Sequence, residues 1–280
     1  MSEGAIDFYT GHPISSEIII ERLSKAEPSV ARPGATLPPE ALFPHDQDHY
    51  GGLDANDALA RLAGLKPGME VVDFCAGLGG PARYLAHRYG VRVTGVELTP
   101  ARVAGAGRLS RLVGMQDRVR VVEGDVTAAP LPDASADAVL SQEAFLHVPD
   151  KAAAMREAFR ILRPGGRLVF TDWVAHEPMS EADAGLMRRG MAVAGLESIA
   201  GWQALILDAG FSLDSVEDRT ADWAPILKAR LAMFRAMREE AAAAGTPTGD
   251  SDFHESYVRF VDLVAAGRLG GGRFAAVKPG

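Results

Sequence analysis

The sequence predicts an α/β protein with a doubly wound, mostly parallel sheet of seven strands. We expect a helical lid before this sheet and a helical insertion before its last strand. The first observation behind this prediction is that short apolar runs alternate with helical patterns five times from Met69 onward. Parallel strands need crossover connections of this kind. The second observation is a glycine-rich break directly after the first predicted strand, at the edge where open α/β sheets bind ligands.

The predicted core strands are short runs rich in Val, Leu and Phe, at 69–74, 91–97, 118–125, 136–143 and 167–173. Helices are predicted among them at 81–90, 99–114 and 150–166. Pro81 suits a first helical turn, and Gly90 suits a helix C-cap. Thr99 and Asp150 stand at the N-cap positions of the next two helices. This alternation is typical of a parallel sheet with helices on both faces.

The chain divides by pattern into an N-terminal helical lid, residues 1–64, and a core domain, residues 65–280. The lid contains two helical patterns with an apolar face, at 15–25 and 53–64. The helical insertion of the core domain covers about 221–268. These added helices are long enough to cover the mouth of a sheet.

The segment after the core strands is polar and contains methionine (174–197), and no element is predicted there. The elements predicted beyond it are a helix at 198–210, a strand at 211–218, helices at about 222–244 and 252–266, and a strand at 272–278. Five apolar residues of the last helix follow a helical spacing: Phe253, Tyr257, Phe260, Val261 and Val264. We interpret this stripe as core packing.

Composition excludes several classes of partner. The 280 residues carry a net charge of −8, which argues against binding a nucleic acid or an anionic lipid surface. The N-terminus shows no secretory signal, and no apolar run reaches the roughly 18 residues of a membrane helix. Cys75 is the single cysteine, so neither an intramolecular disulfide nor a zinc–cysteine cluster can form. We therefore expect a cytoplasmic protein that binds neither nucleic acid nor membrane.

The stretch VVDFCAGLGGPAR (71–83) predicts a ligand site at the start of the core. Its glycines allow the backbone to turn sharply and to present N–H groups at a helix N-terminus. Glu97 stands twenty residues after Gly77, at the end of the second strand, where a carboxylate can bind a ribose diol. Together these features indicate a cofactor that contains adenosine, either a dinucleotide or S-adenosylmethionine.

Three details favour S-adenosylmethionine. Asp73, at the end of the first strand, would repel a pyrophosphate but suits the methionyl ammonium group. Asp125 ends the third strand, where it can meet an adenine amino group. Two further motifs, LSQEAFLHVPDK (140–151) and ILRPGGRLVFTD (161–172), then follow in that order along the chain. With these motifs, residues 65 to 175 resemble the class I S-adenosylmethionine-dependent methyltransferases, whose fold is a Rossmann-like seven-stranded sheet.

The resemblance implies the cofactor-binding residues. Asp73, Ala76, Gly77 and Gly79 match the loop under the methionine part of the cofactor, and Ser141 matches a residue that often touches the methionyl end. The residues that match the ribose and adenine contacts are Glu97, Leu98, Asp125 and Val126. Cys75 departs from the family pattern, because a glycine is common at its position, and we expect altered packing there rather than lost binding.

Methyl transfer also needs side chains that hold the acceptor and take its proton. The candidate catalytic residues are His49, Tyr50, Glu143 and His147, and the candidate substrate-binding residues are Tyr9, Gln47, Gln142 and Trp173. Other roles stay open for three of them. His147 could cap the following helix, Trp173 could be a packing residue, and Glu143 could bind backbone near the sheet edge.

The N-terminal part more loosely resembles the sarcosine and dimethylglycine N-methyltransferase group, in which an N-terminal lid closes the active site. Glu143, Asp172 and Asp48 are acidic and favour an amine acceptor, whereas no arginine can be placed for a carboxylated one. The leading prediction is therefore methylation of an amine nitrogen of a small molecule. Methylation of oxygen or carbon in a phenolic, quinone or polyketide-like acceptor is the alternative. Whether the chain forms a homodimer is left open.

A nicotinamide-dependent oxidoreductase could share this sheet, but we find no Tyr-x-x-x-Lys pair for it. The polar segment LFPHDQDHYGG (42–52) raises a third possibility, a metal site at His45 and His49. Pro44 and Gly51-Gly52 keep any helix there short, and a third ligand is lacking, so no metal is predicted. We interpret the segment as a cover of the active site, with a plain solvated loop as the alternative.

Overall fold

A computed structural model describes Ile6, Tyr9, Gly34 and residues 15–26, 36–243 and 251–280. Its strands are β1 (Glu70–Phe74), β2 (Arg92–Glu97), β3 (Val119–Glu123), β4 (Ala136–Gln142), β5 (Leu162–Ala175), β6 (Ser212–Asp218) and β7 (Leu269–Val277). Its helices are α2 (Ser16–Ala26), η2 (Pro39–Ala41), α3 (Gly52–Ala63), α4 (Gly80–Tyr89), α5 (Pro100–Leu112), η3 (Phe145–His147), α6 (Lys151–Ile161), α7 (Glu181–Met191), α8 (Ile199–Asp208), α9 (Thr220–Ala243) and α10 (Ser251–Ala265).

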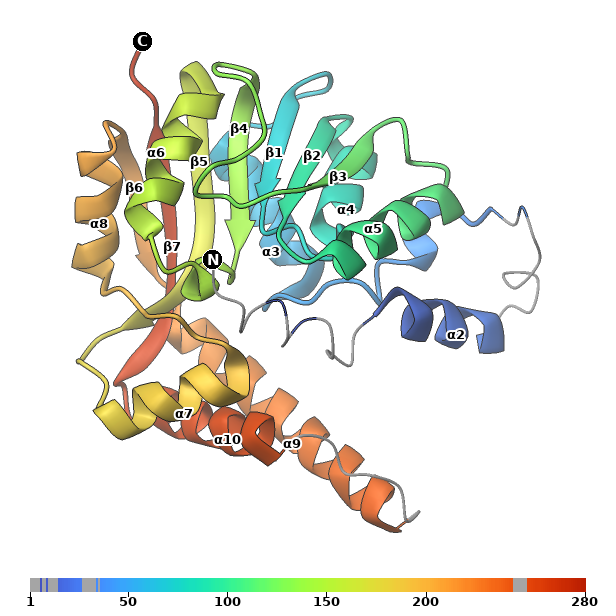
Figure 1. Ribbon diagram of the computed structural model, residues 1–280, viewed down its shortest axis with the longest axis vertical. Helices are drawn as coiled ribbons and strands as arrows, with labels where there is room; N and C mark the ends of the chain where they lie inside the picture. Colours follow the sequence, from blue (N-terminus) through green and yellow to red (C-terminus); the bar gives the residue numbers. More distant parts are fainter. Residues whose placement is uncertain (1–5, 7–8, 10–14, 27–33, 35, 244–250) are drawn as a thin grey trace.

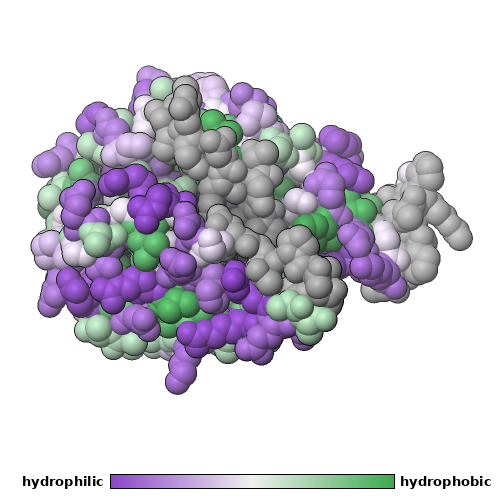
Figure 2. Space-filling view, turned by 60° about the horizontal axis from the view of Figure 1, so that its bottom comes forward, coloured by the Kyte–Doolittle hydropathy of each residue, from purple (hydrophilic) through white to green (hydrophobic). Residues whose placement is uncertain are grey.

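All seven strands form one sheet in the order β3-β2-β1-β4-β5-β7-β6. The five strands from β3 to β5 pair in parallel, and β7 runs antiparallel between β5 and β6. This arrangement confirms the predicted doubly wound, mostly parallel seven-stranded sheet. The carboxyl ends of the parallel strands lie toward a separate layer of helices, α7, α9 and α10 (Figure 1). Seen from that side, the surface is mostly polar with small, separated apolar areas (Figure 2).

Three hydrophobic clusters hold the elements together. The first packs α2, α3, α4 and α5 on one face of the sheet, through residues such as Leu59, Leu85 and Leu109. The second packs α6 and α8 on the other face, with Met155 and Trp202 fully buried. The third joins α7, α9 and α10 beyond the carboxyl ends of the strands. It includes the predicted stripe of α10, so the packing interpretation of that stripe is confirmed.

Two elements differ from the sequence prediction. The segment 174–197, for which no element was predicted, contains α7. Ser180 caps this helix by accepting a hydrogen bond from Asp183 N. Met187 and Met191 lie on its apolar face and are buried. The predicted helix 150–166 ends earlier, at Ile161. Leu162 already begins β5 and pairs with Ala136, because the chain turns to extended backbone before Pro164.

The predicted caps are present with one difference. Pro81 lies in the first turn of α4, Gly90 is its C-cap, and Asp150 caps α6 by accepting from Ala153 N. Thr99 is the N-cap of α5, but its side chain makes no capping hydrogen bond. Within the described ranges, none of the helices is long and apolar enough to cross a membrane.

Candidate active site

The glycine loop after β1 borders a first cavity of about 230 Å³. Seven of the predicted cofactor-binding residues line it: Asp73, Ala76, Gly77, Glu97, Leu98, Asp125 and Val126. Gly79 and Ser141 are not among the lining residues. Gly79 is the N-cap of α4. Ser141 is fully buried, and its hydroxyl donates to Phe74 O at 3.0 Å, which ties β4 to the end of β1.

The backbone conformation at position 77 favours glycine. Its φ is +54°, and a Cβ there would lie 2.8 Å from the Arg102 guanidinium. Cys75, where the family pattern commonly has glycine, also has a left-handed backbone, with φ of +59°. Such a conformation is costly for a residue with a side chain and persists where the surroundings fix it.

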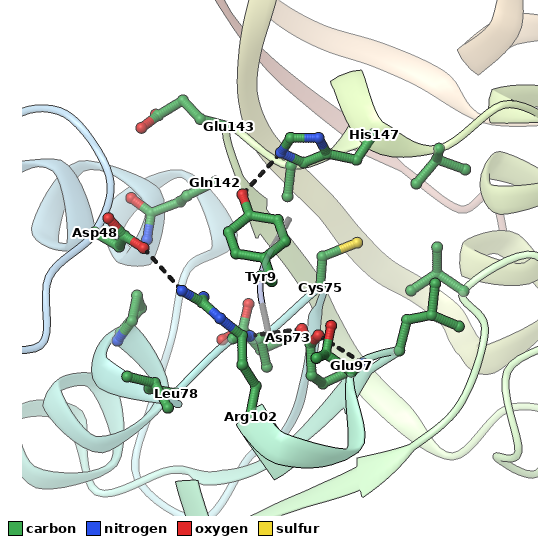
Figure 3. Close-up of a pocket in the computed structure, with 18 of the residues that line it drawn as sticks. Tyr9, Asp48, Asp73, Cys75, Leu78, Glu97, Arg102, Gln142, Glu143 and His147 are labelled. Carbon is green, nitrogen blue, oxygen red and sulfur yellow. Dashed lines mark hydrogen bonds and ion pairs between the residues drawn. The ribbon is translucent and has the colours of Figure 1, made fainter. Parts of the chain in front are cut away.

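The Glu97 carboxylate is fixed by two backbone donors. One oxygen accepts from Gly77 N and the other from Thr99 N, both at 2.9 Å (Figure 3). The carboxylate therefore connects the glycine loop to the start of α5. Each oxygen has a second lone pair with which a ribose hydroxyl could bond. Asp125 is held in a similar way, because one of its oxygens accepts from Thr127 N and Thr127 Oγ1.

Asp73 is buried in the same cavity, and its Oδ2 has no hydrogen-bond partner in the described part of the chain. Burial, and then the nearby Glu97, raise the pKa of this carboxyl group to about 7. A buried carboxylate oxygen without a donor is costly unless a ligand supplies one. The residues present therefore fit the ammonium group of a methionine-derived cofactor at this point.

The polar segment is fixed to the glycine-loop helix by a buried ion pair. Arg83 of α4 donates to Asp46 Oδ2 at 2.9 and 3.2 Å, and both side chains are 0% exposed. The Asp46 backbone also lies against Gly80, where a Cβ would come within 1.8 Å of its carbonyl oxygen. Sequence reasoning missed Arg83. Its signal is a cation in the first turn of a helix, which the helix dipole disfavours without a partner.

His49 and Gln47 belong to one hydrogen-bonded network. His49 Nε2 lies 3.0 Å from Gln47 Oε1, which also accepts from Asn56 Nδ2 at 2.7 Å. His49 Nδ1 lies 3.3 Å from the Tyr50 carbonyl oxygen. Burial lowers the pKa of His49 to about 4, so the imidazole is neutral at pH 7. Nowhere in the described ranges do three or more His, Cys, Asp or Glu side chains gather as a metal site would require.

A second cavity, of about 450 Å³, lies between the polar segment and the layer of α7, α9 and α10. Its walls include Tyr50, Trp173 and Tyr257. Trp173 stacks on Phe260 with the ring centroids 3.6 Å apart, so it is both a packing residue and a wall of this cavity. Arg230 of α9 lies over the Tyr50 ring and donates to the His49 carbonyl oxygen at 2.7 Å.

The two cavities share four lining residues: Tyr9, Asp48, Glu143 and His147. The Tyr9 hydroxyl lies 2.8 Å from His147 Nε2 (Figure 3). His147 Nδ1 lies 3.0 Å from the Ala192 carbonyl oxygen. Because a carbonyl only accepts, Nδ1 carries the proton whenever the ring is neutral, and Nε2 of that tautomer accepts from Tyr9. His147 does not cap the next helix, since Asp150 does.

Glu143 binds backbone near the sheet edge, which was the alternative to a catalytic role. Its carboxylate accepts from Tyr50 N at 2.6 Å and from Thr171 Oγ1 at 2.7 Å. It nevertheless borders both cavities, and burial raises its pKa to about 7. Gln142 lines the first cavity and donates to Asn56 Oδ1 at 2.7 Å.

The charges at the second cavity differ from those that the sequence predicted for an acceptor site. Asp172 is fully buried and lines neither cavity, and its Oδ1 accepts from Trp173 N at 2.7 Å. Asp48 forms an ion pair with Arg102 at 3.4 Å. Two arginines that the sequence did not allow us to place, Arg22 and Arg230, line the second cavity.

Comparison with known proteins gives the following relatives. Residues 72–170 match the family described as a methyltransferase domain. The chain is 34% identical over 188 residues to 27-O-demethylrifamycin SV methyltransferase of Amycolatopsis mediterranei, covering 66% of this chain and 69% of that protein. It is 31% identical over 194 residues to phosphoethanolamine N-methyltransferase 1 of Arabidopsis thaliana, covering 69% of this chain. The match spans 38% of that relative's length, so the chain corresponds to less than half of it.

Solved structures share the fold at lower identity. A provisionally named sarcosine dimethylglycine methyltransferase from Galdieria sulphuraria superposes with a TM-score of 0.73 at 22% identity, over 81% of this chain and 85% of that one. The phosphoethanolamine N-methyltransferase 2 of Haemonchus contortus superposes with a TM-score of 0.77 at 22% identity. This superposition covers 98% of this chain and 60% of the Haemonchus chain. The Haemonchus structure was solved with S-adenosylhomocysteine and phosphomonomethylethanolamine.

Proposed function

The chain belongs to the class I S-adenosylmethionine-dependent methyltransferases, and from this membership we propose that it methylates a small molecule held in the second cavity. The observation that carries the proposal is that Tyr9, Asp48, Glu143 and His147 border both cavities. A methyl group passing from the first cavity to the second would pass these side chains. Transfer from a sulfonium is an in-line displacement, so a junction between a cofactor site and an acceptor site suits it.

The first cavity is proposed as the cofactor site. Asp73 would bind the methionyl ammonium group, Glu97 the ribose hydroxyls, and Asp125 the adenine amino group. The bound cofactor supplies an electrophilic methyl group on its sulfonium sulfur. Gly77 allows the loop backbone to approach the cofactor, and Leu98 and Val126 offer apolar contacts on the adenine side.

His147 is proposed as the base for the acceptor. An acceptor amine or hydroxyl must lose its proton during or before the transfer. The Tyr9 hydroxyl lies 2.8 Å from His147 Nε2, at the junction of the cavities. An acceptor group that replaces or joins this hydroxyl would meet the lone pair of a ring that Ala192 O holds in the correct tautomer.

Of the predicted lid, residues 1–64, we propose the polar segment and Tyr9 as the cover of the active site, over the domain 65–280 with its insertion at about 221–268. Helix α3 lines neither cavity and packs with α4 and α5 on one face of the sheet. The polar segment supports this role because its residues line both cavities and the Asp46–Arg83 pair holds it in place. It would act as a fixed wall. His49, Gln47 and Tyr50 then shape this wall, and Tyr9 covers the junction.

We propose that the nucleophile is an amine nitrogen or a hydroxyl oxygen, and methylation of carbon stays a predicted alternative. The predicted amine is supported by the N-methyltransferases among the relatives. The hydroxyl is supported by the rifamycin relative, which covers the larger share of its own length. It is also supported by the charges of the site, because Asp48 is neutralised by Arg102 and Arg230 lies at the acceptor cavity. A site with these charges attracts a cation weakly, so we place the hydroxyl first.

Two experiments test this proposal. Isothermal titration should show heat of binding with S-adenosylhomocysteine and none with NAD. Heat of binding with NAD alone would contradict the proposal. A screen of amines, phenols and aliphatic alcohols with methyl-labelled S-adenosylmethionine should then place the label on a hydroxyl oxygen. Label found only on amines would reverse the order of the two nucleophiles.

A further inference from the structure

The second cavity is larger and more apolar than a small amine needs. Its volume of about 450 Å³ lies in the range of pockets for drug-sized ligands, roughly 300–1,000 Å³. Its lining includes Trp173, Tyr257, Phe234, Phe253 and Met191. A two-carbon amine would leave most of these side chains without a contact. The size and lining therefore indicate an extended acceptor with a large apolar skeleton.

The surface beside this cavity carries two methionines that are unusually exposed. Met233 and Met237 are each 49% exposed and lie one turn apart on α9. The structure gives three large apolar side chains with such exposure in the described ranges, and the third, Leu207, lies on α8 away from both cavities. Methionine adapts its shape to irregular apolar partners. Both methionines line the second cavity, so an apolar ligand lying there would cover them.

Two buried polar atoms of the cavity walls lack a partner. Trp173 Nε1 and Tyr257 Oη make no hydrogen bond within the described residues, although these residues are only 6% and 5% exposed. Tyr50 is close enough to influence the pKa of Tyr257, but the two side chains do not meet hydrogen-bond geometry. An indole N–H can only donate, and leaving it buried without an acceptor is costly. A ligand with an oxygen in this cavity would relieve that cost.

The orientation of the Trp173 indole is well fixed. It stacks on Phe260 at an interplanar angle of 9°, and Tyr50 lies nearly parallel to it at 6.5 Å. A donor held in one orientation loses little freedom when it bonds a ligand. Trp173 can therefore discriminate between acceptors that present an oxygen to it and acceptors that do not.

We propose that the acceptor is an extended, largely apolar molecule of about two rings or more, with a carbonyl or ether oxygen that accepts from Trp173 Nε1. This inference rests on the proposed function and deepens it by naming the acceptor class. Trp173 and Tyr257 determine specificity, whereas His147 and Tyr9 serve the transfer. Met233 and Met237 cover the apolar end of the molecule.

A matched pair of probes tests the proposal: 4-hydroxybenzophenone, which has a ketone between its two rings, and 4-benzylphenol, which has a methylene there. Affinity is measured by calorimetry on the full chain saturated with S-adenosylhomocysteine. We expect the ketone to bind about five-fold more tightly, as one well-placed hydrogen bond allows. Trp173→Phe should abolish this preference and Tyr257→Phe should reduce it, while Leu207→Gln should leave it unchanged.

Equal affinities in the unchanged chain, or a preference that survives Trp173→Phe, would overturn the role of Trp173. Failure of both probes to bind while ethanolamine binds would overturn the apolar acceptor class. Titration of S-adenosylhomocysteine in the same samples separates this outcome from failure of the proposed function, which would show as a lost cofactor site. If Trp173→Phe does not fold, as judged by its thermal unfolding, Tyr257→Phe carries the test.

Discussion

At the scale of single residues, we expect Asp73 to link cofactor binding to pH. Its pKa is raised to about 7, so the carboxyl group is mostly neutral at pH 6 and mostly ionised at pH 8. In the proposed site, the ammonium group of the cofactor would pair with the ionised form. We therefore predict that the affinity for S-adenosylhomocysteine rises about ten-fold from pH 6 to pH 8 in calorimetric titrations.

Asp73→Asn is the matched control for that titration. It removes the ionisable group and keeps the size of the side chain, so binding should be weaker and nearly independent of pH over this interval. An affinity that is flat from pH 6 to pH 8 in the unchanged protein would show that Asp73 does not bind the ammonium group.

His147 and Tyr9 should affect turnover without affecting the cofactor. A positioned base contributes roughly 10²- to 10⁴-fold to rate. We predict that His147→Ala lowers kcat at least about 100-fold with the best acceptor from the labelling screen, and that Tyr9→Phe has a smaller effect. The affinity for S-adenosylhomocysteine, measured by calorimetry, should change less than about two-fold. His87→Ala, at a partly exposed histidine paired with Glu40, is the control and should keep full activity.

At the scale of elements, the Asp46–Arg83 pair fixes the polar segment to α4. Removing one partner of a buried ion pair leaves an uncompensated charge and typically costs about 3–5 kcal/mol. We predict that Asp46→Asn lowers the free energy of unfolding in urea by about that amount. Glu21→Gln, in the exposed pair with Lys25 on α2, should change it by less than about 0.5 kcal/mol. Similar effects of the two variants would mean that the segment is not fixed by this pair.

The elements also show what the sequence can predict. Strand and helix positions follow from local patterns, which is why β1 to β7, the C-cap Gly90 and the N-cap Asp150 agree with the prediction. The predicted cofactor-binding residues of β1 and β2 lie at strand ends for the same reason, and they line the first cavity. Helix α7 was missed because its burial depends on contacts with α10 and not on a long apolar stripe of its own.

The contacts around the second cavity, the proposed acceptor site, could not be predicted in the same way. The contact between Arg230 and the His49 carbonyl oxygen joins residues 181 positions apart. The bond between Tyr9 and His147 joins residues 138 apart. No local pattern reports such contacts. Asp172 illustrates the converse error, because its place at a strand end suggested the acceptor pocket, whereas its side chain is fully buried outside both cavities.

At the scale of the whole molecule, His49 makes stability sensitive to acid. Its pKa is about 4 in the folded chain and about 6.5 when the chain unfolds. Between pH 7 and pH 5 the unfolded chain therefore binds a proton that the folded chain does not, and stability falls as pH falls. We predict that His49 alone accounts for about 2 kcal/mol of the loss over this interval. Urea unfolding of His49→Gln should show a pH dependence smaller by that amount, and an unchanged dependence would refute the buried neutral histidine.

We expect the cofactor to lie in the first cavity with its sulfur directed at the junction with the second. A crystal structure of the protein with S-adenosylhomocysteine tests it most directly. We predict that the amino group of the ligand bonds Asp73 Oδ2, that the ribose hydroxyls bond Glu97, and that the sulfur faces Tyr9 and His147. A ligand whose sulfur faces away from the second cavity, or which binds outside the first, would contradict the account.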